Sequence, residues 1–257
     1  MATPTGKFVW YEHMGDDIKG AADFYAHLVG WAHKDAGMAG FPYEIVSAGD
    51  HMVGGIMNIP AEAKAMGARP AWMGYIGVED VDASAQNLVE KGGKVWKEPA
   101  DIPGVGRFAV VSDPYGGGFM LFRDAGGNPP PAPPAGTPGL VGWRELHADD
   151  GAKALDFYCD FFSWRRDGEF DMGPVGAYRI FKTADGEQGG VMTRTPQTPR
   201  SFWLYYFNVD ALDAATERAK ARGGQIINGP HQVPGGQWIV QAHDLQGAMF
   251  ALVAAKR

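Results

Sequence analysis

Two segments of the chain repeat one another, and this duplication constrains the fold more than any other feature. Residues 8–31 read FVWYEHMGDDIKGAADFYAHLVGW, and residues 141–164 read VGWRELHADDGAKALDFYCDFFSW, at an offset of 133. A second block matches at an offset of 131, from Val78 to Leu121 in the first copy and from Val209 to Leu252 in the second. Matching blocks in the same order, with a small insertion or deletion between them, predict two copies of one domain.

A proline-rich stretch separates the two copies. Residues 125–134 read AGGNPPPAPP. Proline lacks the backbone N–H and fixes φ, so this stretch can form neither a helix nor an inner strand. The composition predicts an extended polyproline spacer that acts as a tether. We therefore expect a first domain over residues 7–123, a linker over 124–138 and a second domain over 139–254.

Each copy reads as two units in which a strand and a helix are followed by further strands. In the first unit, Phe8–Met14 alternates as a strand, and Asp17 caps a helix whose apolar residues recur at helical spacing. In the second unit, Asp82 is expected to cap the helix, and Gly92 and Gly93 to end it. The remaining strands are expected at residues 43–47, 51–59, 72–78, 94–97, 108–112 and 119–122. The chain is thus predicted to be α+β, with four βαβββ-like units.

Composition excludes several classes of partner. The chain has 257 residues, of which 45% are hydrophobic, and its net charge of -7 argues against nucleic acid, which needs clustered Lys and Arg. No apolar run approaches the ~20 residues that span a bilayer, and the N-terminus lacks the apolar core of a signal peptide, so we expect a cytoplasmic protein without a membrane partner. The single cysteine, Cys159, excludes an intrachain disulfide and is predicted to be a small buried packing residue.

Three motifs resemble the vicinal oxygen chelate superfamily, which includes glyoxalase I, extradiol dioxygenases and the bleomycin and fosfomycin resistance proteins. They are the first helix from Asp17 to Tyr25, the turn Val78–Ala83 and the sequence Asp113-Pro114-Tyr115-Gly116. The loop Ile102–Phe108 is similar to one in a tandem, glyoxalase-like subgroup. The resemblance implies that each domain curls into a half-open, eight-stranded barrel around a cleft. In members with a metal, it implies His, Glu or Gln ligands on the first and last strand of each unit.

The family's ligand positions do not carry metal ligands in this sequence. Alignment on the motifs places Trp10, Met73, Met120 and the region 54–56 at those positions in the first copy. In the second copy the positions fall on Trp143, Leu204, Ala251 and the region 189–191. Indole, thioether and aliphatic side chains do not bind a hard divalent cation. The sequence therefore predicts neither a metal nor another cofactor.

Glu12 and Glu145 are the candidate catalytic residues. Each lies two residues after its copy's tryptophan, on the same face of the strand, and His147 follows Glu145 on that face. A Glu and a His side by side could begin a different metal site, or act as a general base and its partner. The alternative is a carboxylate held for structure. His147 has Met14 as its counterpart, so we expect it to have a structural or surface role.

The other histidines are assigned to the surface. We expect His13 to face outward, because its parity on the strand is opposite to that of Glu12. His51, His231 and His243 lie near strand ends or loops without a counterpart in the other copy. We interpret them as ordinary surface residues.

Aromatic residues at the inferred cleft are the positive evidence for binding. Trp10, Tyr75, Trp143 and Tyr206 have inward parity, beside Met73, Met120 and Leu204. Such walls suit a planar or hydrophobic small molecule, although the same residues could fill the barrel as core. Arg107 follows a glycine-rich turn, which could hold an anion or simply join two strands.

Three functions are compatible with these patterns. The favoured hypothesis is a metal-independent protein that binds a small hydrophobic or aromatic molecule, related to glyoxalase and bleomycin resistance proteins. The second is a lyase, isomerase or dioxygenase with a non-standard site around Glu12, Glu145 and His147. The third is a structural or interaction protein whose clefts are filled. We expect a monomer with its two domains packed together, or a homodimer.

Overall fold

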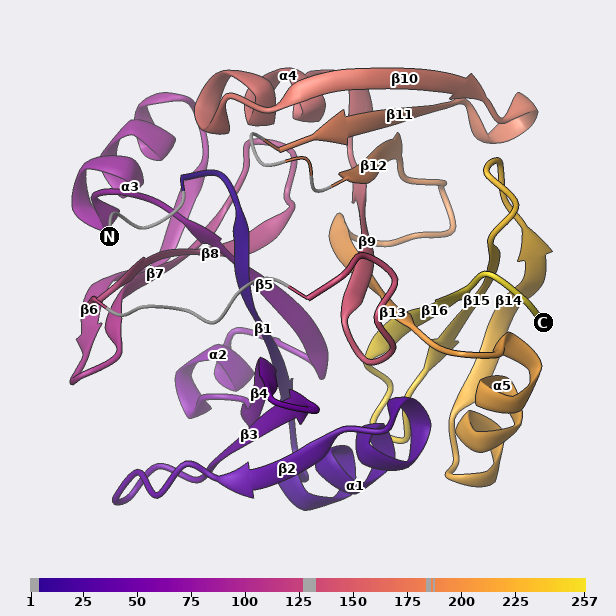
Figure 1. The fold of residues 1–257 in the computed structure, drawn as a ribbon. Helices are drawn as coiled ribbons and strands as arrows, with labels where there is room; N and C mark the ends of the chain where they lie inside the picture. The colour runs from indigo at the N-terminus through magenta and orange to yellow at the C-terminus, as the bar shows by residue number, and fades with distance from the viewer. Residues whose placement is uncertain (1–4, 127–132, 184–185, 187) are drawn as a thin grey trace. The chain divides into compact units, whose positions relative to one another are not determined.

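The computed structural model describes residues 5–126, 133–183, 186 and 188–257. Its strands form two mixed eight-stranded sheets, and Figure 1 shows the strands as labelled arrows. The strand orders are β2-β3-β4-β1-β5-β8-β7-β6 and β10-β11-β12-β9-β13-β16-β15-β14. Both orders are linear, so each sheet is open and has two edges. This confirms the predicted α+β class and the repeated half-open sheets. Most of the predicted polyproline spacer lies at 127–132, outside the described residues.

Both copies contain the same succession of elements. In the first copy they are β1 (Phe8–Gly15), α1 (Ile18–Val29), β2 (Ala32–Asp35), β3 (Tyr43–Ala48), β4 (His51–Asn58), α2 (Ala61–Ala65), β5 (Ala71–Gly77), α3 (Val81–Glu90), β6 (Lys94–Ile102), β7 (Gly106–Ser112) and β8 (Gly118–Asp124). In the second they are β9 (Val141–Ala148), α4 (Gly151–Phe162), β10 (Arg165–Asp171), the 3₁₀ turn η1 (Gly173–Val175), β11 (Ala177–Lys182), β12 (Gln188–Thr193), β13 (Phe202–Asn208), α5 (Leu212–Ala221), β14 (Gln225–Gln232), β15 (Trp238–His243) and β16 (Met249–Ala254). None of the helices in the described part of the chain is long and apolar enough to span a bilayer.

Helix starts follow local side-chain chemistry. Asp17 accepts a hydrogen bond from the N–H of Gly20 at 3.0 Å and caps α1, as predicted. The prediction for α3 was wrong by two residues, because the extended residue Asp80 is the cap and accepts from Ala83 N–H at 3.0 Å. Asp82 lies in the first turn of α3 instead. Aspartates at alternate positions make the cap ambiguous in the sequence, and the extended backbone of Asp80 decides it.

Two short elements of the first copy were not anticipated. The edge strand β2 has the sequence AHKD, whose residues are all at least partly exposed, so no apolar alternation marks it. The helix α2 has only five residues and buries none of them. Elements without a buried face leave no hydrophobic pattern for the sequence to show.

The chain divides into two compact units, which we call unit 1 and unit 2. Unit 1 comprises Met1–Val9, Met73–Pro129 and Arg144–Trp203, and unit 2 comprises Trp10–Trp72, Pro130–Trp143 and Leu204–Arg257. Each unit therefore combines one four-stranded module from each copy: β5–β8 with β9–β12 in unit 1, and β1–β4 with β13–β16 in unit 2.

The duplicated tryptophan after the first helix of each copy makes the same kind of hydrogen bond in both units, from its indole N–H to a backbone carbonyl. In unit 2, Trp31 Nε1 donates to the carbonyl of Gly139 at 2.7 Å, and in unit 1, Trp164 Nε1 donates to the carbonyl of Gly6 at 2.6 Å. Gly139 has a φ of +82°, and a Cβ there would lie 3.0 Å from Trp31 Nε1. Each indole thus holds the segment just before the first strand of the other copy.

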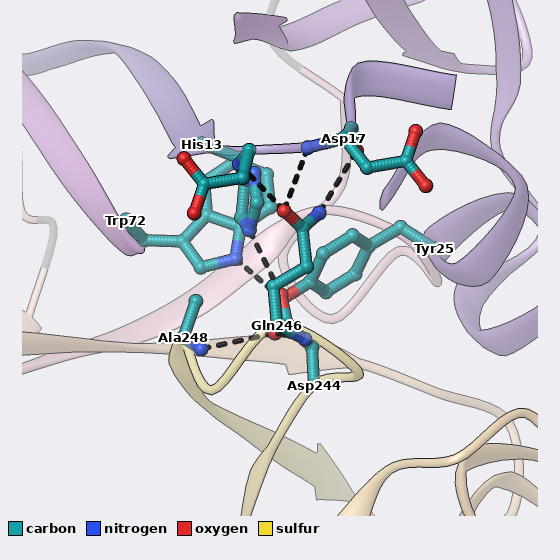
Figure 2. Close-up of polar contacts among 8 residues, drawn as sticks. His13, Asp17, Tyr25, Trp72, Asp244, Gln246 and Ala248 are labelled. Carbon is teal, nitrogen blue, oxygen red and sulfur yellow. Dashed lines mark hydrogen bonds and ion pairs between the residues drawn. The ribbon is translucent and has the colours of Figure 1, made fainter. Parts of the chain in front are cut away.

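A buried aspartate anchors each unit. In unit 1, Asp113 accepts hydrogen bonds from the Tyr158 hydroxyl at 2.8 Å and from two backbone N–H groups of its own loop. In unit 2, Asp244 accepts from the Tyr25 hydroxyl at 3.0 Å and from the backbone of Gln246 and Ala248 (Figure 2). Both carboxylates are 3% exposed, so these donors satisfy charges that burial would otherwise penalise.

Among the described residues of these two networks, His13 has no counterpart, and the expectation that it faces outward was wrong. Its side chain is fully buried, and Nε2 lies 2.8 Å from Asp244 Oδ2 (Figure 2). Its ring also contacts Tyr25, with centroids 5.6 Å apart. The strand parity was right, but helix α1 covers the face of β1 that the sequence analysis assigned to solvent. Of the other histidines, His231 is exposed, and His51 and His243 are partly exposed.

Candidate functional site

The two faces of β1 have different roles in unit 2. Tyr11 and His13 face buried aromatic neighbours, since the Tyr11 ring lies 5.1 Å from that of Tyr205 and His13 packs on Tyr25 of α1. Trp10 and Glu12 alternate with them and therefore occupy the opposite face. The sequence parity thus places both predicted residues on the face away from α1.

Glu12 is joined to Trp10 through a residue that the sequence analysis missed. The hydroxyl of Tyr43, on β3, donates to Glu12 Oε2 at 3.1 Å, and Trp10 Nε1 donates to the same hydroxyl at 2.9 Å. Glu12 is 3% exposed, whereas Trp10 and Tyr43 are half-buried. Burial and the nearby charge of Glu12 raise the pKa of Tyr43 well above its usual value, so the phenol keeps its proton and remains a donor.

A glycine makes room for this tyrosine. Gly55 on β4 is the register partner of Glu12, and a Cβ at Gly55 would lie 1.9 Å from the Tyr43 hydroxyl. Residues 54–56 are also the region that aligns with a family ligand position. The Tyr43 hydroxyl therefore occupies the space that any side chain at Gly55 would need.

The second copy repeats this arrangement in unit 1. The hydroxyl of Tyr178, on β11, donates to Glu145 Oε2 at 2.7 Å. Gly190 is the register partner of Glu145, and a Cβ there would lie 2.1 Å from the Tyr178 hydroxyl. The Gly-Gly pair in each copy, with a tyrosine upstream at the start of a strand, was the available sequence signal for this Glu–Tyr pair.

His147 lies beside Glu145, as the sequence parity implied. Its Nε2 is 2.7 Å from Glu145 Oε1, and its ring stacks on Phe202 with centroids 4.5 Å apart and an interplanar angle of 6°. The two oxygens of Glu145 therefore have different partners, Tyr178 on one and His147 on the other. The side chains of Glu145 and His147 are 9% and 13% exposed.

The remaining predicted pocket residues fall into two groups by burial. Tyr75, Met120, Leu204 and Tyr206 are exposed by 5% or less, as core residues are. Trp10, Met73 and Trp143 are half-buried and keep surface that a ligand can contact. Tyr75 and Met120 are register partners on β5 and β8, and Tyr206 is opposite Ala251 and accepts from Gln241 at 2.8 Å.

The residues do not fit the metal that the family resemblance implies. The Tyr43 and Tyr178 hydroxyls fill the space at Gly55 and Gly190, and the other aligned positions carry indole, thioether or aliphatic groups. No group of three His, Cys, Asp or Glu side chains with the arrangement of a metal site occurs among the described residues.

Two other side chains have local explanations. The Arg107 guanidinium donates to Asp82 at 2.6 and 2.8 Å and to Asp101 at 2.9 Å. Arg107 follows the turn that was considered as an anion site, and neighbouring carboxylates already bind its guanidinium. Cys159 is half-buried, and burial raises the pKa of its thiol, which leaves it a poor nucleophile.

Comparison with known proteins identifies the family of the chain. The model of the Glyoxalase/Bleomycin resistance protein/Dioxygenase superfamily matches residues 7–128 and 141–252. The putative glyoxylase CFP32 of Mycobacterium tuberculosis (strain CDC 1551 / Oshkosh) is 31% identical over 249 residues, which cover 95% of this chain and 93% of that protein. The anthracycline biosynthesis protein DauV of Streptomyces sp. (strain C5) is 30% identical over 266 residues, which cover 96% and 93%.

Solved structures agree on the fold. The Mn(II)-bound glyoxalase from Novosphingobium aromaticivorans superposes with a TM-score of 0.64 at 16% identity, over 98% of this chain and 83% of that one. The 2,3-dioxygenase LapB from Pseudomonas sp. KL28 gives 0.67 at 12% identity, over 99% and 93%. At such identities the likeness establishes the architecture and leaves the chemistry to this chain's own residues.

Proposed function

Because this chain belongs to the Glyoxalase/Bleomycin resistance protein/Dioxygenase superfamily, we propose that it binds a small hydrophobic or aromatic molecule without the family's metal. Each copy contributes one site, at its Glu–Tyr pair. A relative named for anthracycline biosynthesis supports a ligand with aromatic rings. We also propose a cytoplasmic monomer or homodimer, with domains at 7–123 and 139–254 on either side of the linker 124–138.

The observation that carries this proposal is the hydrogen-bonded series from Trp10 through Tyr43 to Glu12. A half-buried indole and a half-buried phenol lead to a buried carboxylate, and the exposed ring of Phe41 stacks on Tyr43 with centroids 6.2 Å apart. Aromatic surface with a few fixed polar groups is the usual composition of a small-molecule site. The fixed polar groups of this series then orient the polar end of a ligand.

The donor set supports the proposed metal independence. Each buried glutamate is already held by a tyrosine hydroxyl, and at Glu145 both oxygens are engaged. A hard divalent cation needs several converging oxygen or nitrogen donors. We therefore expect purified protein to contain less than one equivalent of Ni, Zn, Fe or Mn per domain. A chelator should leave the melting temperature unchanged.

Calorimetric titration with 4-nitroanisole, an uncharged aromatic probe, tests the proposal. We expect saturable binding, which Trp10→Leu weakens about 10-fold at the first copy's site because it removes an aromatic wall. Trp96→Leu is the matched control, since Trp96 is an exposed indole on β6. Absence of saturable binding, or equal effects of the two substitutions, would favour a structural protein with filled clefts. One tightly held metal per domain would favour the enzyme alternative.

A further inference from the structure

The two sites are not equivalent, because the second copy has two residues that the first lacks. His147 and Phe202 take the places of Met14 and Ala71 at the offsets of the duplication, 133 and 131. These two residues also contact each other, ring on ring. Together they add a stacked imidazole to the second copy's site.

Two contacts fix this imidazole, and a third fixes the glutamate that holds it. Glu145 Oε1 holds Nε2 at 2.7 Å, Phe202 stacks on the ring face, and the Tyr178 hydroxyl holds the other oxygen of Glu145 at 2.7 Å. On β12, the register partner of His147 is the uncharged Met192. Glu145 therefore contacts His147 directly, and Tyr178 contacts it through Glu145.

The contact with Glu145 decides which ring nitrogen carries the proton. With Glu145 ionised, its carboxylate only accepts hydrogen bonds, and Nε2 is assigned as the donor. In the neutral imidazole this leaves Nδ1 with a lone pair. Nδ1 has no hydrogen-bond partner among the described residues. It is also absent from the buried side-chain atoms without a partner in that part of the chain, so Nδ1 is accessible. In this tautomer, Nδ1 thus presents a lone pair that a ligand can approach.

We propose that the second copy's site is specific for phenols, meaning aromatic ligands with an acidic hydroxyl, and that His147 Nδ1 takes the hydroxyl proton. The O–H bond breaks, an N–H bond forms at Nδ1, and the electron pair stays on the phenolate oxygen. Glu145 stabilises the resulting imidazolium through Nε2. No oxidant, reductant or metal takes part.

This inference rests on the proposed function, because it assumes that the Glu–Tyr pair marks a binding site. It adds a specificity that only one copy has. A hydrogen bond that gains charge on proton transfer is stronger than a neutral one, so a phenol should bind about 10- to 100-fold more tightly than its methyl ether. The first copy, with Met14 in place of the imidazole, should make no such distinction.

The test compares 4-nitrophenol with 4-nitroanisole by calorimetry and absorbance. In the wild type, we expect the preference for 4-nitrophenol, and a phenolate absorbance band for the bound probe at a pH below its pKa in water. His147→Met, which introduces the first copy's residue, should abolish both while 4-nitroanisole still binds. His147→Gln keeps a donor for Glu145 and should behave in the same way if His147→Met fails to fold. Met14→Leu is the matched control and should leave the preference unchanged.

The outcomes separate the two proposals. A preference that survives both His147 substitutions, or bound 4-nitrophenol that remains protonated, would overturn the phenol specificity while leaving the general binding function intact. A preference that depends on His147 without any binding of 4-nitroanisole would support the phenol site and overturn the general one. If neither probe binds, both proposals are wrong.

Discussion

Replacing His13 by leucine tests the energetics of the buried network in unit 2. Leucine is the natural choice, because Leu146 is the corresponding residue of the second copy. Unit 1 shows what remains without the histidine: Asp113 is held by the Tyr158 hydroxyl and by backbone N–H groups alone. His13→Leu therefore converts the Asp244 network into the form that unit 1 already has.

The expected loss of stability follows from the contacts of Asp244. The substitution removes one charge-assisted hydrogen bond at 2.8 Å, from a pair with no solvent exposure. Breaking a buried pair costs about 3–5 kcal/mol when the remaining charge is left uncompensated. Here the Tyr25 hydroxyl and the N–H groups of Gln246 and Ala248 still compensate it. We therefore expect a loss of about 2–3 kcal/mol in the free energy of unfolding at neutral pH.

The contribution of Asp244 to the pH dependence has a definite sign. Burial alone would raise the pKa of Asp244, but the hydrogen bond and charge of His13 hold it below 3.8. Asp113, which has no histidine, has its pKa raised by burial despite its hydrogen bonds. In the wild type, the contribution of Asp244 is present above pH 3.8 and is lost only as the pH falls through the lower folded pKa. In His13→Leu the folded-state pKa of Asp244 rises. The variant therefore loses stability as the pH increases through that folded-state pKa.

Urea unfolding at pH 4.5 and pH 7, followed by circular dichroism, measures this effect. The difference between wild type and His13→Leu should be larger at pH 7 than at pH 4.5. Tyr158→Phe is a useful comparison, because it weakens the Asp113 network, which has no ion pair. A loss below about 0.5 kcal/mol, or an equal loss at both pH values, would contradict the assigned role of His13.

Three further perturbations probe separate features. Gly55→Ala would place a Cβ 1.9 Å from the Tyr43 hydroxyl, so we expect the free energy of unfolding to fall by about 1–3 kcal/mol in thermal denaturation. Adding Tyr43→Ala should restore part of this loss. Strictly additive losses in the double variant would argue against the contact. Trp164→Phe removes the 2.6 Å hydrogen bond to the Gly6 carbonyl and should cost about 1 kcal/mol in urea unfolding; an unchanged midpoint would mean that water replaces the indole without loss. Burial raises the pKa of Cys159, so iodoacetamide at pH 8 should alkylate it more slowly in the native protein than in urea, and equal rates would show that the thiol is not shielded.

Several structural features could be read from the sequence because their causes are local. The Asp17 cap, the apolar face of α1 and the alternation of β1 each depend on residues within a few positions of one another. Because the second copy repeats the sequence of the first, the same predictions apply there, and Asp150 caps α4 in the same way. The strand β2 and the cap of α3 could not be predicted as securely, since no buried face or single candidate marks them.

The candidate site was predicted only in part. Strand parity placed Glu12 and Glu145 on the face away from the helix, and His147 beside Glu145, because side chains alternate along a strand. It gave no indication of Tyr43 or Tyr178, which reach the glutamates from a neighbouring hairpin. Hairpin register decides which side chain lies over which glycine, and that register depends on packing rather than on the pattern of one strand.

The sequence by itself determined the duplication, the α+β class and which residues share a strand face, because each depends on local periodicity or on direct comparison of the copies. Only the tertiary structure decided what covers each face. His13 and Asp244 are 231 positions apart, yet they form one buried pair. The alternation of a strand shows that it has two faces, but the partners of a buried charge come from distant segments, and the free energy of desolvation selects them only when the whole core has formed.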